Sequence, residues 1–305
     1  MRRSLLGLLV VLASLLATAA PASAGPGSAV RESDVDHDRA DDELPLIAGS
    51  RGGVEVFWWS AKGVESALPL VPFVQFELNP NLVLDIHVPI SFVVNAHIRG
   101  EDKAILGLGN PTVGLTYVTT SNGLTWFVGG RASLPLAGMS DSRTWVQSNL
   151  FGAIGMSLYD LHYWAYKYLP VGARGGFEYQ TKNSIFFRGE LAPTIYVPLD
   201  SDQAGIVGAA QRKTQLFYQL RVEMEGRADS GWGGGLGLQV FHAVTEGDTL
   251  GRGDNAQGAI EPFLSYDSSS TFGRLGCLIA LDTPLGLGFD KGKVAALHLT
   301  LGTHF

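Results

Sequence analysis

Charged side chains recur at every second position inside otherwise apolar stretches of this 305-residue chain. Arg188 and Glu190 form one such pair, and Arg221 and Glu223 form another. Acids and arginines brought together can hold one another as ion pairs, or they can line a passage for polar solutes. We favour ion pairing for most of them, because mixed charges at close quarters pair with one another first. The alternating set comprises Glu55, Gln75, Glu77, Asp85, His87, Arg131, Arg174, Glu178, Arg188, Glu190, Arg221, Glu223, Glu261, Arg274 and Asp282.

Alternation with a period of two predicts β-strands, since a helix would repeat its apolar positions every three or four residues. In one stretch Ile185, Phe187 and Leu191 point to one face, while Arg188 and Glu190 point to the other. Charged side chains on a single parity fit an interior that is polar and an outside that faces lipid. Twelve segments follow the pattern: 52–60, 70–78, 82–95, 104–119, 123–137, 170–180, 183–197, 212–226, 231–246, 257–267, 270–284 and 292–305.

The connections between these segments alternate in length, which is typical of bacterial barrels with tight periplasmic turns and longer outer loops. A soluble β-sandwich gives no reason for this alternation. We therefore predict an all-β fold, a closed antiparallel transmembrane β-barrel of about twelve strands over 51–305, with ten or fourteen strands as the alternatives. The predicted turns are 79–81, 120–122, 181–182, 227–230 and 268–269, and the predicted loops are 61–69, 96–103, 138–169, 198–211, 247–256 and 285–291.

The first 24 residues have the pattern of a secretory signal peptide, with two arginines, an apolar run and small residues before a cleavage site. The acidic stretch 25–50 is predicted to be a disordered periplasmic tail. No later stretch has about 18 consecutive apolar residues, which excludes helical membrane spans. A secreted chain with so much alternating apolar surface is expected in the bacterial outer membrane.

Charge and cysteine content narrow the possible partners. Without Arg2 and Arg3 the chain has 20 basic and 29 acidic residues, a net charge of −9, so nucleic acid is not expected. Cys277 is the only cysteine, which excludes an intramolecular disulfide. The segment 34–38 imitates half of a calcium loop but lacks its glycine and closing glutamate, so we expect no metal and no cofactor.

Aromatic residues stand at the ends of several predicted strands, where membrane interfaces favour them. Phe305, the final residue, also resembles the C-terminal signal that the outer-membrane assembly machinery recognises. We therefore expect that machinery and outer-membrane lipid as partners. The strand-end aromatics are Trp58, Trp126, Tyr179, Trp232, Tyr266 and Phe305.

Prolines within predicted strands mark sites of interrupted pairing, because proline cannot donate to a ladder. We expect each to produce a bulge or local opening, and the densest break is 106–111, with the sequence LGLGNP. The prolines concerned are Pro89, Pro111, Pro135, Pro193 and Pro262.

The stretch AILGLGNPTVGLTYV, preceded by NPNLVLDIHVPISFVV and followed by GLTWFVGGRASLPLAG, resembles outer-membrane proteins grouped with the MetA pathway of phenol degradation. That family is similar to the long-chain fatty-acid channels. The matching motifs are Val88-Pro89-Ile90, Gly107 to Leu115 and Leu134-Pro135-Leu136. Asn110 stands where the family usually has an acid, so no carboxylate role carries over to it. The resemblance implies a monomeric barrel that admits small hydrophobic or aromatic molecules.

The loop 138–169 is rich in aromatic residues. It either folds as a lid or plug over the mouth of the barrel, or its aromatics seat it at the outer-leaflet surface. We predict a channel whose solutes bind these aromatics and leave through the lumen or sideways at the break near Gly109. The predicted pathway residues are Gly107, Gly109, Asn110, Pro111, Trp145, Phe151, Tyr163 and Trp164.

Two other functions compete with a channel. One is a plugged barrel that serves as a structural or surface protein. The other is an outer-membrane lipid hydrolase, which needs a Ser, a His and an orienting side chain together on the lipid-facing surface. No Ser/His pair in the sequence has that placement, so we do not expect an enzyme.

Overall fold

The computed structural model describes residues 49–61, 64–98, 101–140, 143–181, 183–199, 205–206, 209–210, 213–245, 256–281 and 295–305. The predicted signal peptide and nearly all of the predicted acidic tail lie outside the described residues, as does Asp282. Pro45–His304 form one compact unit, which contains every strand.

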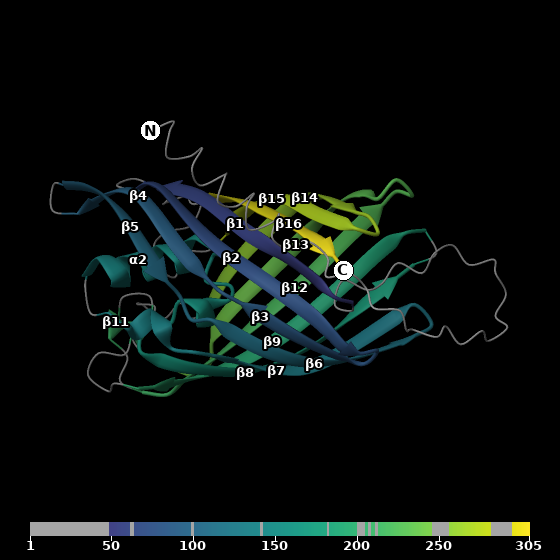
Figure 1. Ribbon diagram of the computed structural model, residues 1–305, viewed down its shortest axis with the longest axis horizontal. Helices are drawn as coiled ribbons and strands as arrows, with labels where there is room; N and C mark the ends of the chain where they lie inside the picture. Colours follow the sequence, from purple (N-terminus) through teal and green to yellow (C-terminus); the bar gives the residue numbers. More distant parts are fainter. Residues whose placement is uncertain are drawn as a thin grey trace. The chain divides into compact units, whose positions relative to one another are not determined.

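The chain folds as a closed twelve-strand antiparallel β-barrel, as the alternation predicts (Figure 1). β1 closes the ring, because its Val54 lies opposite Leu301 of β16 on one side and Pro72 of β2 on the other. The strands are β1 (Arg51–Ala61), β2 (Val64–Asn79), β3 (Leu82–His87), β4 (Ile90–Ile98), β5 (Glu101–Leu108), β6 (Thr112–Ser121), β7 (Leu124–Ser133), β8 (Tyr168–Gln180), β9 (Ile185–Pro198), β12 (Gln215–Arg227), β13 (Trp232–Ala243), β14 (Ala256–Asp267), β15 (Thr271–Ala280) and β16 (Ala295–His304).

Two of the twelve predicted strands are each broken in two, at the prolines that the sequence marks. β3 and β4 are separated at Val88-Pro89, and β5 and β6 at residues 109–111. The broken ends stay joined by backbone bonds, since Gly109 N donates to Pro89 O at 2.8 Å and Leu134 N donates to Pro111 O at 2.8 Å. The backbone at both breaks therefore stays hydrogen-bonded to neighbouring parts of the wall.

β5 is the edge of the sheet. Among the described residues it pairs with β4 alone, whereas every other strand of the barrel sheet has at least two neighbours. β7, its expected second neighbour, ends at Ser133, opposite Thr112 of β6. The predicted strand 123–137 is therefore too long at its C-terminal end, because Pro135 ends it and begins the 3₁₀ helix η1 (Leu136–Gly138).

The two ends of the barrel differ in their connections. One end of the barrel, which we call the turn end, has five tight turns in the described chain, as predicted. In the turn between β6 and β7, Asn122 and Gly123 both have positive φ, which suits a two-residue hairpin. The other end, here the loop end, has the predicted long connection after β7, whereas the predicted loop 285–291, most of 198–211 and nearly all of 247–256 lie outside the described residues. Its predicted loops 61–69 and 96–103 are wrong. There β1 and β2, and β4 and β5, extend until two residues separate them.

Pro69 lies in the first of these wrongly predicted loops. It occupies a strand position in β2, opposite Ser91 of β4, although it has no N–H to donate to a ladder. The ladder between β1 and β2 is interrupted beside it, whereas pairing between β2 and β4 continues. Pro193 and Pro262 are similar, because each is paired with one neighbouring strand and lies at a short gap in the ladder to the other. These gaps are the local openings that prolines predict.

The barrel wall has an apolar outer face and a mixed inner face. In β6, Val113, Leu115 and Tyr117 are 45%, 46% and 51% exposed on the outside, while Thr112 and Thr116 are buried inside. An apolar outer face over alternate strand positions fits contact with lipid.

The connection between β7 and β8 carries the helices of the described chain. They are η1, α2 (Arg143–Gly155) and η2 (Leu161–Tyr163). None of the described helices is long and apolar enough to span a bilayer. A two-stranded hairpin, β10 (Gly205–Ile206) and β11 (Ala209–Ala210), lies in the connection between β9 and β12.

Candidate functional site

The connection between β7 and β8, here the inserted segment (residues 134–140 and 143–167), occupies the lumen at the loop end. α2 packs against β2, β4 and β5 (Figure 1). Ser148 Oγ donates to Ser91 O at 3.0 Å, and Trp59 Nε1 donates to Phe151 O at 3.1 Å. The close approach needs glycine in the wall, because a Cβ at Gly107 would lie 2.7 Å from Ser148 Cβ.

The same segment reaches the far wall of the barrel. Arg131 of β7 pairs with Asp160 at 3.2 Å and also donates to Gln219 of β12 at 3.2 Å. The guanidinium of Arg221, also in β12, lies 5.9 Å from the centre of the Tyr159 ring. Since β12 stands six strands from β2 around the ring, the segment crosses the whole lumen.

Apolar side chains fill the lumen around the segment. Leu158, Leu161, Tyr163 and Trp164 are all less than 5% exposed and belong to one cluster with residues of the wall. An aromatic row continues the cluster across the strands, with successive ring centres 6.1, 5.1 and 5.0 Å apart. The row consists of Tyr168, Tyr196, Phe217 and Phe241.

His162 is the one buried histidine of the inserted segment in the described chain. Its ring is 1% exposed and neither ring nitrogen has a hydrogen-bond partner. Burial lowers the pKa of His162 well below its ordinary value, and nearby Arg131 opposes protonation further. The ring is therefore neutral and acts as part of the apolar packing.

Asn110 joins the strand break to the inserted segment. Its Nδ2 donates to His162 O and Ala165 O, both at 2.9 Å, and its Oδ1 accepts from Ala137 N at 2.8 Å. Its backbone N donates to Tyr163 O at 2.6 Å. The side chain is fully buried, so every one of these bonds replaces water. Asn110 thus holds two separate parts of the segment against the wall.

The predicted pathway residues gather at this junction. Gly107, Gly109 and Asn110 are buried where the wall meets the segment, and Pro111 lies at the break itself. Phe151, Tyr163 and Trp164 lie in the lumen and not at an outer surface; Trp145 is half-buried and donates to Ala137 O at 2.8 Å. Sequence reasoning missed α2, because its polar and apolar residues are mixed on all sides and do not form the one-sided stripe that marks a surface helix.

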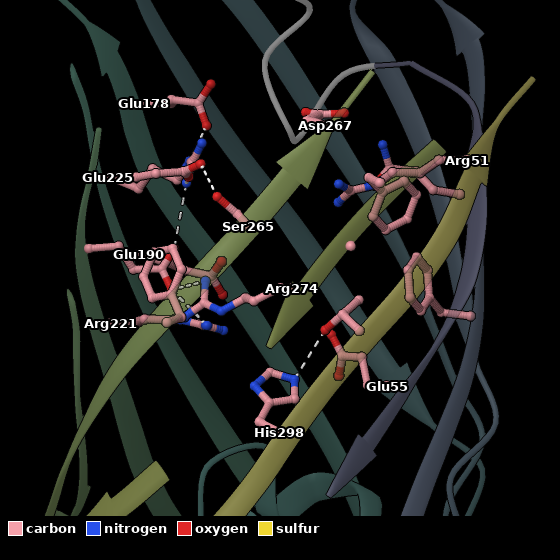
Figure 2. A pocket seen from close by; sticks show the side chains of 18 of the residues that line it. Arg51, Glu55, Glu178, Glu190, Arg221, Glu225, Ser265, Asp267, Arg274 and His298 are labelled. Atoms are coloured by element: carbon pink, nitrogen blue, oxygen red, sulfur yellow. Dashed lines mark hydrogen bonds and ion pairs between the residues drawn. The ribbon is translucent and has the colours of Figure 1, made fainter. Parts of the chain in front are cut away.

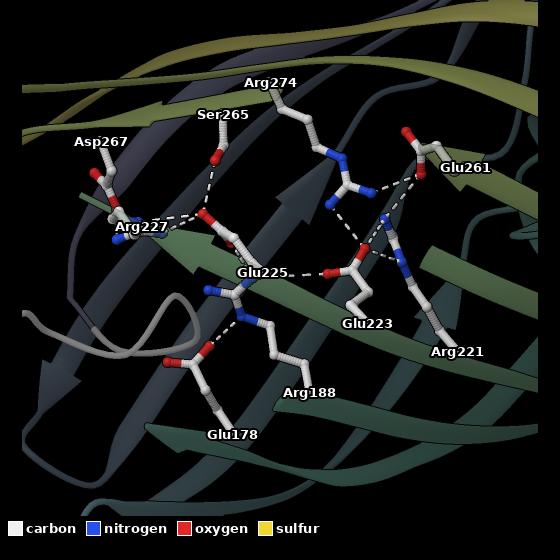
Figure 3. A network of polar contacts seen from close by, with 10 residues as sticks. All are labelled: Glu178, Arg188, Arg221, Glu223, Glu225, Arg227, Glu261, Ser265, Asp267 and Arg274. Atoms are coloured by element: carbon white, nitrogen blue, oxygen red, sulfur yellow. Dashed lines mark hydrogen bonds and ion pairs between the residues drawn. The ribbon is translucent and has the colours of Figure 1, made fainter. Parts of the chain in front are cut away.

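The turn-end half of the lumen holds an ionic lattice (Figure 3). Arg188 bridges Glu178 and Glu225, each at 2.5 Å. Arg274 bridges Glu223 and Glu261, each at 2.7 Å. These charges come from β8, β9, β12, β14 and β15, so the lattice ties neighbouring strands to one another.

Further pairs extend the lattice around the ring. Arg221 contacts Glu223 at 2.7 Å, and Arg227 contacts Asp267 at 3.1 Å. Across the lumen, Arg174 pairs with Asp85 at 3.0 Å. The favoured interpretation, charges that pair with one another, holds for these residues.

Most of the predicted interior set lies where parity put it. Glu77 is the exception: it is exposed at the turn end and does not line the cavity described next. Arg51, Arg227 and Asp267 belong to the same interior and were missed. Arg227 was assigned to the turn 227–230, Arg51 comes just before the predicted strand 52–60, and Asp267 is the last residue of the predicted strand 257–267. Continuing the alternation by one step from Glu225 would have found Arg227.

A cavity of about 280 Å³ lies among the residues of the lattice, and no described residue of the inserted segment lines it (Figure 2). Arginines, carboxylates and aromatic rings line it together. Arg51, Glu55, Phe73, Phe272, Glu190 and His298 are among its lining residues. Its wall can contact both a charged group and an apolar body.

Comparison with known proteins supports the fold. No family model matches the chain, and no curated protein matches it. The COG4313 outer membrane channel from Pseudomonas putida F1 is similar, with a TM-score of 0.58 and 12% identity over 89% of this chain and 100% of that chain. The NanC porin is similar with a TM-score of 0.52 and 7% identity over 83% and 98%. The chain shares the fold of these outer-membrane barrels.

Proposed function

We propose that this protein is a bacterial outer-membrane channel for small hydrophobic or aromatic molecules. The observation that carries the proposal is the barrel itself, with an apolar outer face, a polar inner half and a cavity lined by charges and rings. The names of the two similar structures, a channel and a porin, agree with it. The resemblance of residues 70–137 to the MetA-pathway proteins supplies the class of solute.

The route for an apolar solute runs past the break at residues 109–111. β5 has one unpaired side there, and the outward residues Leu106, Leu134 and Met139 are 63%, 58% and 71% exposed. An opening between lumen and lipid at this point would let a solute pass sideways without crossing the ionic lattice. It requires the inserted segment to move, because Gly109 and Asn110 are covered by it.

A cross-link between α2 and the wall tests the proposal. In the double variant Gly107→Cys/Ser148→Cys, made with Cys277→Ser, the two Cβ atoms start 2.7 Å apart, and α2 has to move away from the wall by about 1 Å to reach the Cβ spacing of a disulfide. The probe is 1-N-phenylnaphthylamine, whose fluorescence rises as it enters Gram-negative cells. We expect uptake to fall several-fold after oxidation and to return after reduction. The Ser148→Cys single variant is the matched control.

The alternative is a plugged barrel that transports nothing. It is favoured by the bonds of Asn110, which fix the segment to the wall at three points. Uptake equal in expressing and non-expressing cells, unchanged by the oxidation step, would decide for that alternative.

The proposal also includes how the protein reaches its membrane. We infer that the signal peptide directs secretion and that Phe305 is read by the outer-membrane assembly machinery. The barrel then acts as a monomer surrounded by lipid. Replacing Phe305 with Asp is expected to lower the amount of folded barrel in outer-membrane fractions, measured by heat-modifiable migration in gels; an unchanged amount would remove Phe305 from this role.

A further inference from the structure

The cavity holds three charges that the protein itself leaves unpaired. Six arginines line it, and five of them contact a carboxylate: Arg174, Arg188, Arg221, Arg227 and Arg274. Arg51 has no ion pair among the described residues, and its Nε has no hydrogen-bond partner. Glu55 and Glu190 likewise have no ion pair or side-chain hydrogen bond in the described part of the chain. In a lattice this well paired, three exceptions in one cavity suggest a ligand.

Two of the three unpaired charges stand on one strand. Arg51 and Glu55 are four residues apart in β1, on the same inward face (Figure 2). A strand rises about 3.3 Å per residue, so their Cα atoms are about 13 Å apart. They are not in ion-pair contact with each other, and a molecule of modest length could touch both.

Aromatic rings lie between these two charges. Phe73 is opposite Gly53, the inward position between Arg51 and Glu55, and a Cβ there would lie 3.1 Å from the ring edge. The rings of Phe73 and Phe272 have centres 6.2 Å apart. The guanidinium of Arg51 lies 5.6 Å from the centre of the Phe272 ring. The wall therefore offers a cation, an aromatic surface and an anion in that order.

We propose that this cavity binds an aromatic zwitterion, a molecule with a carboxylate and an ammonium group at opposite ends of a ring. The carboxylate pairs with Arg51, whose planar fork suits two oxygens. The ammonium group contacts Glu55, and the ring packs on Phe73 and Phe272. Glu190, across the cavity, adds negative charge that favours the cationic end. The inference goes beyond the proposed channel function and does not rest on it, because the proposed sideways route bypasses the lattice that lines this cavity.

Three related compounds test each contact separately. They are 4-(aminomethyl)benzoate, 4-methylbenzoate, which lacks the ammonium group, and 4-methylbenzylamine, which lacks the carboxylate. Binding to the purified full-length protein in detergent is measured by isothermal titration calorimetry. We expect the zwitterion to bind at least about tenfold more tightly than either single-charge compound, since each of those compounds lacks one charge-assisted contact.

Two neutralising variants assign the ends of the ligand. In Arg51→Gln the zwitterion should bind no more tightly than 4-methylbenzylamine. In Glu55→Gln the zwitterion should bind no more tightly than 4-methylbenzoate. Glu77→Gln is the matched control, because Glu77 follows the same strand parity outside the cavity. Retained barrel structure is checked for each variant by heat-modifiable migration.

Each other outcome overturns the proposal. Equal binding of all three compounds, or none, would mean that the unpaired charges are simply hydrated. If 4-methylbenzoate bound as tightly as the zwitterion, the cavity would be an anion site. If 4-methylbenzylamine bound as tightly as the zwitterion, the cavity would be a cation site. Because calorimetry needs no transport, lost binding with intact dye uptake refutes this inference alone, whereas intact binding without uptake refutes the channel.

Discussion

The two halves of the lumen are filled in different ways. At the turn end, charges from the wall strands pair across neighbouring strands, as Arg188 does with Glu178 and Glu225. At the loop end, a single connection folds inward and fills the space with apolar side chains. The charged side chains at the turn end belong to the strands of the wall, whereas many of the apolar side chains at the loop end belong to the inserted segment, which packs against the wall.

This difference has a consequence for motion. The lattice cannot be displaced without breaking pairs of largely buried charges, which costs several kcal/mol per uncompensated ion. The inserted segment is held by packing, by one ion pair from Arg131 to Asp160, and by a small set of neutral hydrogen bonds, which contribute about 0.5–1.5 kcal/mol each. Substitutions at the turn end should therefore change stability, and those at the loop end should change permeability.

The largest expected effect is on stability, from Arg188→Ala. Glu178 has Arg188 as its one ion-pair partner among the described residues, and Glu225 would lose its 2.5 Å contact. We expect the free energy of unfolding to fall by about 3–5 kcal/mol, because two carboxylates lose a shared cation. Urea unfolding of the protein in lipid vesicles measures it.

A double variant sharpens this result. Arg188→Ala/Glu178→Gln removes the cation together with one of the charges that it compensates. We expect it to be more stable than Arg188→Ala alone. If the double variant were the less stable of the two, unpaired charge would not be the source of the loss, and the lattice would have no special weight.

A smaller effect on stability but a larger one on permeability is expected from Asn110→Ala. The change leaves Ala137 N without its partner and frees two carbonyls, for a loss of about 2–3 kcal/mol. The segment should detach from the break, so dye uptake should rise several-fold.

Asn81→Ala is the matched control for Asn110→Ala. Asn81 Nδ2 also donates to a backbone carbonyl, Val118 O at 2.8 Å, but at the turn end. We expect some loss of stability and no change in uptake. Equal uptake in the two variants would contradict the division of the barrel into a fixed half and a movable half.

Sequence reasoning predicted the wall better than its contents, for a physical reason. A strand that faces lipid on one side and charges on the other repeats with period two, and this pattern is visible without any partner. β9 and β12 were found in this way, with Arg188 and Glu223 on the correct face. Strand boundaries were wrong at Pro69 and Pro135, because a proline can occupy a strand position, interrupt a strand or end it.

The inserted segment could not be predicted in the same way. Its aromatics suggested a lid or plug, but they equally suggested contact with the outer leaflet. The choice between the two depends on the space inside the barrel and on the close approach of α2 to Gly107. Both follow from the closure of the twelve strands into a barrel, which the sequence of the segment does not contain. The role of Asn110 was also hidden, since its partners are backbone groups 27 to 55 residues away.

The smallest expected effect compares two hydroxyl groups, one in each half. Ser148→Ala removes the 3.0 Å bond from α2 to Ser91 O, and Thr120→Ala removes a 2.9 Å bond to Thr125 near the turn end. We expect each to cost about 1 kcal/mol of unfolding free energy, the usual contribution of one neutral bond. Uptake should rise measurably for Ser148→Ala alone, because that bond fastens the movable half to the wall. A rise of equal size in Thr120→Ala would mean that dye uptake follows overall stability, and that detachment of the segment is not what admits the dye.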